Sequence, residues 1–169
     1  MVKNDLSERD LLIKAQNYCS VSEHCVAEVR DKLYQWGATA EVRDRVIDSL
    51  LDNGFIDESR YAAAFVHDKV AFQGWGREKI RMMLLMKHIA SPIVDEAIHT
   101  IDEDVYQRQL DHLIDNYQLT NQTATLNSLP STLHNSPSGA QSTIKLARFL
   151  AQRGFTTDEI YSALHDEGC

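Results

Sequence analysis

The stretch GFIDESRYAAAF, residues 54–65, joins two helical patterns and contains a short burst of charge. Gly54 ends the first pattern, because glycine accepts the left-handed conformation that often follows a helix. Asp57 stands where a helix N-cap is expected, since its carboxylate can accept hydrogen bonds from exposed backbone N–H groups. Ile56 and Tyr61 have the spacing of a hydrophobic staple. We therefore interpret Asp57-Glu58-Ser59-Arg60 as the start of a helix rather than as a catalytic cluster.

Apolar residues recur at three- and four-residue steps on both sides of this stretch, which is typical of amphipathic helices. Ser22 is the expected N-cap of the helix that ends at Gly37. Ser91 is the expected N-cap of a later helix, with Pro92 at its first helical position. The predicted helices include about residues 5–19, 40–52, 77–87, 103–117, 141–153 and 157–166. Three more are expected between the Ser22 cap and Gly37, between the Asp57 cap and Gly74, and after Ser91-Pro92.

The composition favours an all-α protein. The chain has 169 residues, of which 43% are hydrophobic, but only seven glycines and three prolines, whereas all-β proteins need frequent turn residues. No apolar run resembles a signal peptide or a membrane span, and the three cysteines are an odd number. We expect reduced thiols, a cytoplasmic location and no membrane partner.

The helical pattern repeats three times along the chain. When Gly37, His88 and Gly154 are aligned, apolar residues coincide one residue later, four residues earlier and eight residues earlier. The coinciding sets are Ala38, Ile89 and Phe155; Leu33, Leu84 and Leu150; and Val29, Ile80 and Leu146. We expect His88 to adopt a positive φ, which histidine tolerates better than most residues.

This register predicts three tandem three-helix repeats, each resembling a helix-turn-helix unit, at residues 1–54, 55–102 and 103–169. The expected fold is all-α, with the repeats forming an elongated curved array. Each repeat is too small to be very stable alone, so contacts between neighbours should matter. Residues 118–140 carry no formal charge and are rich in Ser, Thr, Asn and Gln. We interpret them as a flexible polar insertion in the third repeat rather than as a helix.

Motifs for catalysis, nucleotides or metals are weak. Gly74-Trp75-Gly76 lacks the longer glycine fingerprint and the preceding strand of a phosphate-binding loop. Trp75 is expected to wedge into the core, and an exposed contact is the alternative. Cys19, His24 and Cys25 lack the paired spacing of structural zinc ligands. No linear nucleophile–base arrangement is visible. We expect a protein that is not an enzyme and has no cofactor and no metal.

The net charge of −8 disfavours a protein that coats nucleic acid. The charge is uneven, however. Residues 69–87 hold five cations and one acid, and residues 116–157 hold three cations and no acid. The sequence therefore predicts a local basic surface on an acidic molecule.

Several stretches together resemble the RecX family of bacterial recombination regulators. They are the helix from Ser22 to Gly37 with Lys32-Leu33, the junction Gly54-Phe55-Ile56-Asp57 followed by Arg60-Tyr61-Ala62, Gly74-Trp75-Gly76, Ile80-Arg81 with Leu84, and KLARFLAQRGFTTDEI at residues 145–160. The resemblance covers about residues 20–117 and 141–167, and it lies in the order and spacing of the motifs rather than in any one of them.

The resemblance implies a non-enzymatic regulator that binds the RecA recombinase filament and inhibits or modulates its recombinase and ATPase activities. DNA repair, recombination and the SOS response are the implied processes. We expect a monomer that contacts the filament protein and makes weak contact with the single-stranded DNA inside it. The repeat register aligns Lys79 with Lys145 and Lys87 with Arg153, which suggests a shared basic face. The predicted partner-binding residues are Arg77, Lys79, Arg81, Lys87, Lys145, Arg148 and Arg153.

Three alternatives stay open at this point. These cations are equally compatible with ordinary solvated helix faces, since isolated exposed charges contribute little. The second alternative is a helical module that binds single-stranded or duplex DNA directly. Acids such as Glu41, Asp44, Asp48 and Asp52 on one helix would be repelled by phosphates, which argues against duplex binding. A generic helical protein-interaction adaptor is the third possibility.

Overall fold

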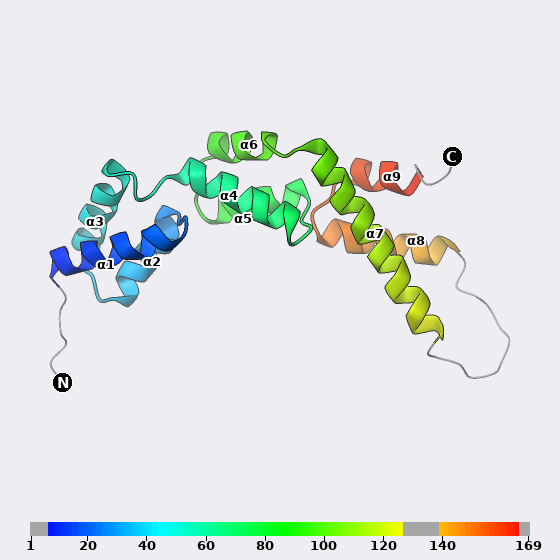
Figure 1. Ribbon diagram of the computed structural model, residues 1–169, viewed down its shortest axis with the longest axis horizontal. Helices are drawn as coiled ribbons and strands as arrows, with labels where there is room; N and C mark the ends of the chain where they lie inside the picture. Colours follow the sequence, from blue (N-terminus) through cyan, green and yellow to red (C-terminus); the bar gives the residue numbers. More distant parts are fainter. Residues whose placement is uncertain (1–6, 127–138, 166–169) are drawn as a thin grey trace. The chain divides into compact units, whose positions relative to one another are not determined.

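The computed structural model describes the backbone of residues 7–126 and 139–165 and the side chains of residues 7–120 and 141–165. All regular structure in the described part of the chain is helical, which confirms the all-α prediction (Figure 1). The helices are α1 Glu8–Val21, α2 Val26–Gln35, α3 Ala40–Asp52, α4 Glu58–Ala71, α5 Arg77–Met86, α6 Ser91–His99, α7 Glu103–Leu126, α8 Gly139–Gln152 and α9 Thr157–His165.

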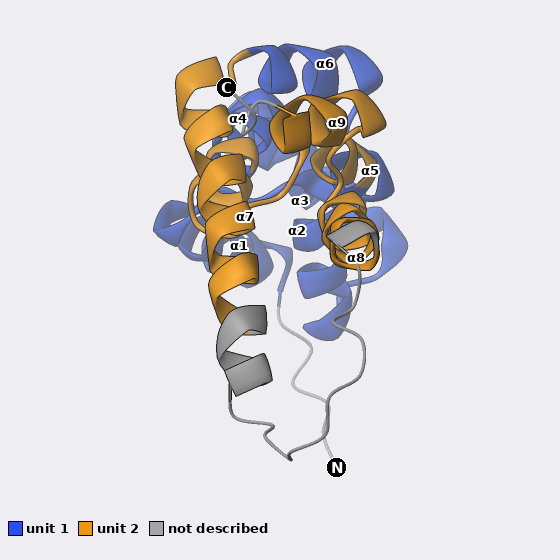
Figure 2. Ribbon diagram, turned by 90° about the vertical axis from the view of Figure 1, so that its right-hand side faces the viewer, with its two compact units in different colours: residues 1–65, 83–99 blue, residues 66–82, 100–169 orange. Residues whose placement is uncertain are grey.

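The chain divides into two compact units, each of which is built from two separate stretches of the sequence (Figure 2). Unit 1 holds the chain up to Phe65 together with Met83–His99, and unit 2 holds Val66–Met82 together with the chain from Thr100 onward. Helices α4 and α5 therefore each contribute residues to both units, a division that does not follow the three predicted repeats. The repeat boundaries at residues 54 and 102 stay a prediction.

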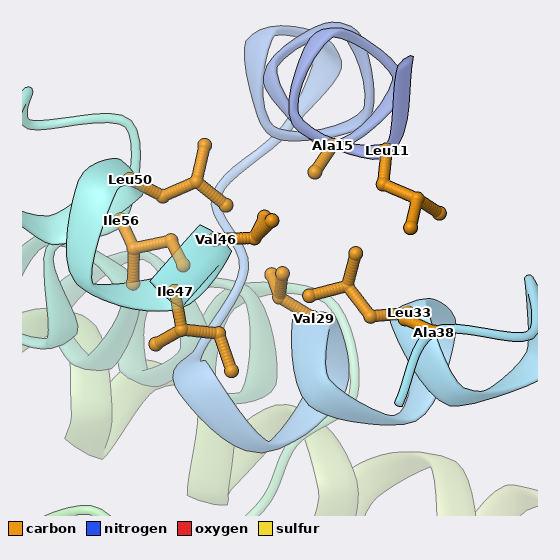
Figure 3. Packing of buried hydrophobic residues seen from close by; sticks show 9 residues of the cluster. All are labelled: Leu11, Ala15, Val29, Leu33, Ala38, Val46, Ile47, Leu50 and Ile56. Carbon is orange, nitrogen blue, oxygen red and sulfur yellow. The ribbon is translucent and has the colours of Figure 1, made fainter. Parts of the chain in front are cut away.

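The core of unit 1 lies where α1, α2 and α3 pack against one another. Figure 3 shows Leu11 and Ala15 pointing from α1 towards Val29 on α2 and Val46 on α3. All four are at most 3% exposed, and full burial of each larger aliphatic side chain contributes about 1.5–3 kcal/mol. The same cluster also contains Leu33, Ala38, Ile47, Leu50 and Ile56.

The aligned turns have the same backbone hydrogen bonds in all three places. The N–H of Ala38 donates to the carbonyl of Leu33, and the N–H of Gly37 donates to that of Tyr34, both at 3.0 Å. This pair of bonds defines a Schellman C-cap, which requires a left-handed residue at its centre. The same two bonds recur around His88 and around Gly154.

The side chains of the repeat register confirm the predicted alignment. Leu33, Leu84 and Leu150 are each 0% exposed. The other six coinciding residues of the register are buried as well. His88 has φ 64°, close to the φ 88° of Gly37 and Gly154. The recurring turn thus tolerates a histidine, as its position in the register predicts.

The stretch at residues 54–65 folds as its sequence indicates. One carboxylate oxygen of Asp57 accepts hydrogen bonds from the N–H groups of Ser59 and Arg60, at 2.9 and 3.0 Å. Ile56 and Tyr61 are buried, at 2% and 7% exposure. The burst of charge is therefore a helix start, and Arg60 pairs with Glu23 at 3.0 Å.

Three predictions about helix ends were wrong. Ser91 does not precede α6 as its cap, because the helix already includes Ser91 and the N–H of Val94 donates to the carbonyl of Ala90 at 3.1 Å. Ser22 does not cap α2, which begins three residues later than a Ser22 cap would place it, with Cys25 as its N-cap residue. Ser22 instead ends α1 and hydrogen-bonds with His24 at 2.9 Å. Extended backbone at both Ser22 and Cys25 separates the two helices.

The predicted polar insertion at 118–140 also begins too early. Helix α7 continues past residue 117 to Leu126. Glu103–Leu126 contains no glycine or proline, the two residues that oppose a helix most strongly. The hydroxyl of Thr120 donates a hydrogen bond of 2.7 Å to the carbonyl of Asn116, four residues earlier in the same helix. Residues 127–138 of the predicted insertion lie outside the described residues.

None of the helices in the described ranges is both long enough and apolar enough to cross a membrane.

Candidate partner-binding surface

The seven predicted partner-binding cations are divided between the units. Unit 1 contains Lys87, and unit 2 contains the other six. The six lie on α5, on α8 and directly after α8: Arg77, Lys79, Arg81, Lys145, Arg148 and Arg153. Their use in partner binding stays a prediction, but their surroundings differ sharply.

Lys145 and Arg148 are exposed on α8. They lie beside Ile144, an apolar side chain that is itself 58% exposed. Leu146 and Leu150 hold the opposite face of α8 in the core, at 5% and 0% exposure. The burial of these leucines fixes the face of α8 that carries the two cations.

Arg77 already holds two carboxylates of its own chain. Its guanidinium forms ion pairs with Glu103 and with Glu159, the latter at 2.8 Å, and its side chain is only 25% exposed. The guanidinium also lies 3.9 Å from the ring centroid of Tyr106. Arg77 therefore connects the start of α5 to α7 and α9. Its substitution would disturb the packing of unit 2 in addition to any partner contact that it makes.

Lys87 is likewise engaged within the protein. Its ammonium lies 2.6 Å from a carboxylate oxygen of Glu28, which also accepts the Tyr61 hydroxyl at 2.8 Å and pairs with His24 at 3.0 Å. Burial raises the pKa of Glu28, but the hydrogen bonds from Lys87, His24 and Tyr61 outweigh burial and lower the pKa overall. Glu28 therefore links α2 to α4 and to the turn after α5.

Lys79 and Arg153 come together around the turn that follows α8. The Lys79 ammonium lies 4.4 Å from the ring centroid of Trp75, and Lys69 approaches the same ring at 5.0 Å. Arg153 donates to the carbonyl of Gln73 at 2.8 Å. Trp75 is partly buried, so it is neither a fully exposed contact nor completely enclosed.

The glycine pair in Gly74-Trp75-Gly76 has a packing role that sequence reasoning missed. A Cβ on Gly76 would lie 2.2 Å from the carbonyl carbon and oxygen of Gly154. The two backbones touch because the N–H of Gly76 donates to the carbonyl of Arg153 at 2.8 Å and the N–H of Glu78 donates to that of Gly154 at 3.1 Å. Gly76 is therefore required for close backbone approach, not for phosphate binding.

A second internal repeat also went unnoticed in the sequence. The stretches IDESRY, residues 56–61, and IDEDVY, residues 101–106, share Ile-Asp-Glu-x-x-Tyr and open α4 and α7. In both stretches the Asp caps its own helix, since Asp102 accepts the N–H of Val105 at 2.9 Å as Asp57 does for its helix. The motif was detectable from sequence as a repeat with a spacing of 45 residues (101 minus 56).

The tyrosines of this motif attach each new helix to an earlier one. Tyr61 donates its hydroxyl to Glu28 on α2, whereas the Tyr106 oxygen accepts the N–H of Arg77 at the start of α5, at 3.1 Å. Glu103 of the second copy pairs with the same Arg77. Burial raises the pKa of both tyrosines, so both keep their protons at neutral pH. The two tyrosines thus occupy the same place in the motif, but one donates its hydroxyl hydrogen bond to a carboxylate and the other accepts one from a backbone N–H.

The residues considered for a metal have other contacts. His24 stacks on Tyr18 with 3.9 Å between ring centroids and pairs with Glu28. Cys25 is buried, and burial raises the pKa of its thiol. Across residues 7–126 and 139–165, His, Cys, Asp and Glu form no group of three or more suited to a metal ion.

Comparison with known proteins identifies relatives along the whole chain. Residues 13–50 match the domain family "RecX, first three-helix domain", and residues 57–98 match "RecX, second three-helix domain". The regulatory protein RecX of Pseudomonas savastanoi pv. phaseolicola is 30% identical over 146 residues, which is 86% of this chain and 84% of that protein. The regulatory protein RecX of Ectopseudomonas mendocina is 28% identical over 169 residues, which is 100% of this chain and 99% of that protein.

Solved structures show the same fold. The crystal structure of RecX from Lactobacillus salivarius superposes with a TM-score of 0.73 at 21% identity and covers 94% of this chain and 95% of that one. A second crystal structure, of a regulatory protein RecX, gives a TM-score of 0.71 at 19% identity, covering 94% of this chain and 73% of that one.

Proposed function

The chain belongs to the RecX family of regulatory proteins, and from this we propose that it binds the RecA recombinase filament and restrains its ATPase and strand-exchange activities. The chain acts as a binding protein in the cytoplasm and catalyses no reaction of its own. DNA repair, recombination and the SOS response are the processes it would affect. Family membership is the observation that carries this proposal.

The architecture supports binding to a polymer. The same Schellman turn and the same leucine recur in all three predicted repeats, so the chain offers similar modules in tandem. Several modest contacts on one chain add up to strong binding when they engage together. A filament presents its protomers at regular intervals, which suits a partner built of repeated modules.

The exposed face of α8 is the best-supported part of the proposed contact surface. Lys145 and Arg148 are exposed there, whereas Arg77 and Lys87 are tied to carboxylates of the same chain. Exposed cations beside the apolar Ile144 suit an acidic protein surface or the DNA phosphates of a filament.

A titration of RecA ATPase activity on single-stranded DNA tests the proposal. We expect the chain to lower the steady-state rate, and the variant Lys145→Glu/Arg148→Glu to need a higher concentration for the same inhibition. The matched control is Arg9→Glu/Arg108→Glu, which reverses two cations that are also exposed, on α1 and α7. Equal inhibition by both double variants would show that the α8 face is not part of the contact surface. No inhibition by the parent chain would contradict the proposed function.

Direct contact with single-stranded DNA is the second candidate function. Phe72 is 78% exposed in unit 2, and the ammonium groups of Lys69 and Lys79 lie 5.0 and 4.4 Å from the ring centroid of Trp75. Aromatic rings with neighbouring cations bind single strands by stacking and charge. Anisotropy of a labelled oligothymidine without recombinase separates the candidates, since tight and salt-dependent binding favours the DNA-binding module.

A further inference from the structure

A groove opens on unit 1 beside the first copy of the Ile-Asp-Glu-x-x-Tyr motif. Its volume is about 800 Å³, within the range of pockets that accept drug-sized ligands. It is lined by α2, by the C-terminal part of α3, by the first residue of α4 and by the end of α5 with the turn that follows. The lining residues that matter are Val26, Ala27, Asp31, Leu51, Glu58 and Met86.

The sequence explains why this place is open. The register that aligns Gly37 with His88 and Gly154 places Cys25 opposite Gly76, and His88 opposite Gly154. In unit 2 the backbones of Gly76 and Gly154 touch, because neither residue has a Cβ. Cys25 and His88 both have one, so the equivalent turn in unit 1 cannot approach α2 in that way. His88 lines the groove instead.

Four of the residues that line the groove are apolar, and two of them are well exposed. Met86 is 66% exposed and Leu51 is 41% exposed, and both line the groove together with Val26 and Ala27. Large apolar side chains gathered around a concave surface are typical of an interaction site. Single exposed apolar residues are common on protein surfaces, so it is the gathering of several around one hollow that distinguishes this place.

The charge that remains available in the groove is negative. Of the cations that line it, Arg30 is paired with Asp44 at 2.6 Å and Lys87 with Glu28 at 2.6 Å. Asp31 is exposed, and Glu58 is half-buried at the start of α4. Within the described ranges, neither of these two carboxylates forms an ion pair with a cation, so a basic ligand would find both unneutralised.

We propose that this groove binds an amphipathic segment of a protein partner, in which a large apolar side chain is flanked by lysine or arginine. The apolar side chain packs against Leu51 and Met86, and the flanking cation pairs with Asp31 or Glu58. The acidic lining disfavours DNA phosphates. The groove therefore serves a contact different from that of the α8 cations, and this inference does not depend on the recombinase assignment.

The test uses the full chain and a fluorescein-labelled helical peptide built only of leucine and lysine. We expect saturable binding by fluorescence anisotropy that weakens with added salt, and no binding of a leucine–glutamate peptide of the same length. Equal binding of both peptides, or preferential binding of a labelled oligothymidine, would overturn the proposal. So would sedimentation velocity showing that a second copy of the chain occupies the groove.

Matched variants locate the peptide on the chain. Asp31→Lys should weaken binding of the leucine–lysine peptide about fivefold, and Met86→Ser about tenfold. The controls are Glu96→Lys, an equal charge change on an exposed acid of α6, and Val21→Ser at an apolar residue that is 85% exposed outside the groove. Circular dichroism confirms that each variant folds. If the controls weaken binding as much as the groove variants, the peptide binds elsewhere and the proposal is wrong.

Discussion

Substitution of Gly76 by alanine should destabilise unit 2 strongly, although alanine is the better helix former. The added Cβ would lie 2.2 Å from Gly154 and 2.4 Å from the backbone nitrogen of Phe155. These neighbours are backbone atoms, so relief requires the start of α5 and the turn after α8 to separate. Separation would break the hydrogen bonds from Gly76 to Arg153 and from Glu78 to Gly154.

The expected cost follows from those contacts. Each backbone hydrogen bond contributes about 0.5–1.5 kcal/mol net, and lost packing adds to this, so we expect a total of about 2–4 kcal/mol. For a chain of this length that corresponds to a fall in Tm of roughly 5–12 °C. The matched control is Gly37→Ala, because a Cβ on Gly37 meets nothing within 4 Å and costs only the left-handed conformation, about 1 kcal/mol.

Thermal unfolding followed by circular dichroism compares the two variants, and hydrogen exchange at the amides of residues 76 and 78 locates the change. Both amides should lose protection in the Gly76 variant and keep it in the Gly37 variant. A Gly76→Ala protein that is as stable as Gly37→Ala, with both amides still protected, would refute the claim that the two backbones must touch.

Three further predictions concern the junction of unit 1 and the exposed cations. Glu28→Gln should lower stability by about 1–2 kcal/mol at pH 7. Because the folded pKa of Glu28 is lowered, its contribution is present above the ordinary carboxyl pKa and is lost as the pH falls through the folded value. In urea titrations, the difference in stability between the parent chain and Glu28→Gln should therefore be smaller at pH 3 than at pH 7. Burial raises the pKa of Glu58, so Glu58→Gln should not lower stability at pH 7. His88→Gly should raise stability by about 0.5–1 kcal/mol, since it removes a left-handed residue that has a Cβ, and a lower midpoint in urea would contradict this. Lys145→Glu/Arg148→Glu should leave the helical circular dichroism unchanged while it weakens inhibition of RecA-driven strand exchange, and an unchanged inhibition curve would exclude that face of α8.

Local sequence signals predicted the recurring turns because the physics there is local. Gly37 and Gly154 indicate left-handed C-caps, and a buried leucine stands four residues before each of them, at helical spacing. Even His88 could be placed, because the apolar register around it matches those of the two glycine turns. The capping role of Asp57 followed in the same way from a polar residue directly before an amphipathic pattern.

Contacts between residues far apart in the sequence could not be predicted from such local signals. Arg77 meets Glu159 across 82 residues, and the Gly76–Gly154 contact has no periodic signal. Charge alone placed Arg77 and Lys87 among the surface cations, whereas the fold gives both an internal carboxylate partner. Helix α7 passed residue 117 because a polar composition does not by itself end a helix.

The measurement that tests the central claim most directly is sedimentation of the full chain with RecA filaments assembled on single-stranded DNA. The family assignment and the repeated modules predict that the chain appears in the pellet in proportion to recombinase and saturates at a fixed ratio. The chain should stay in solution when the recombinase is left out and the DNA alone is present. A chain that remains in the supernatant beside intact filaments, or that pellets with DNA alone, would contradict the account.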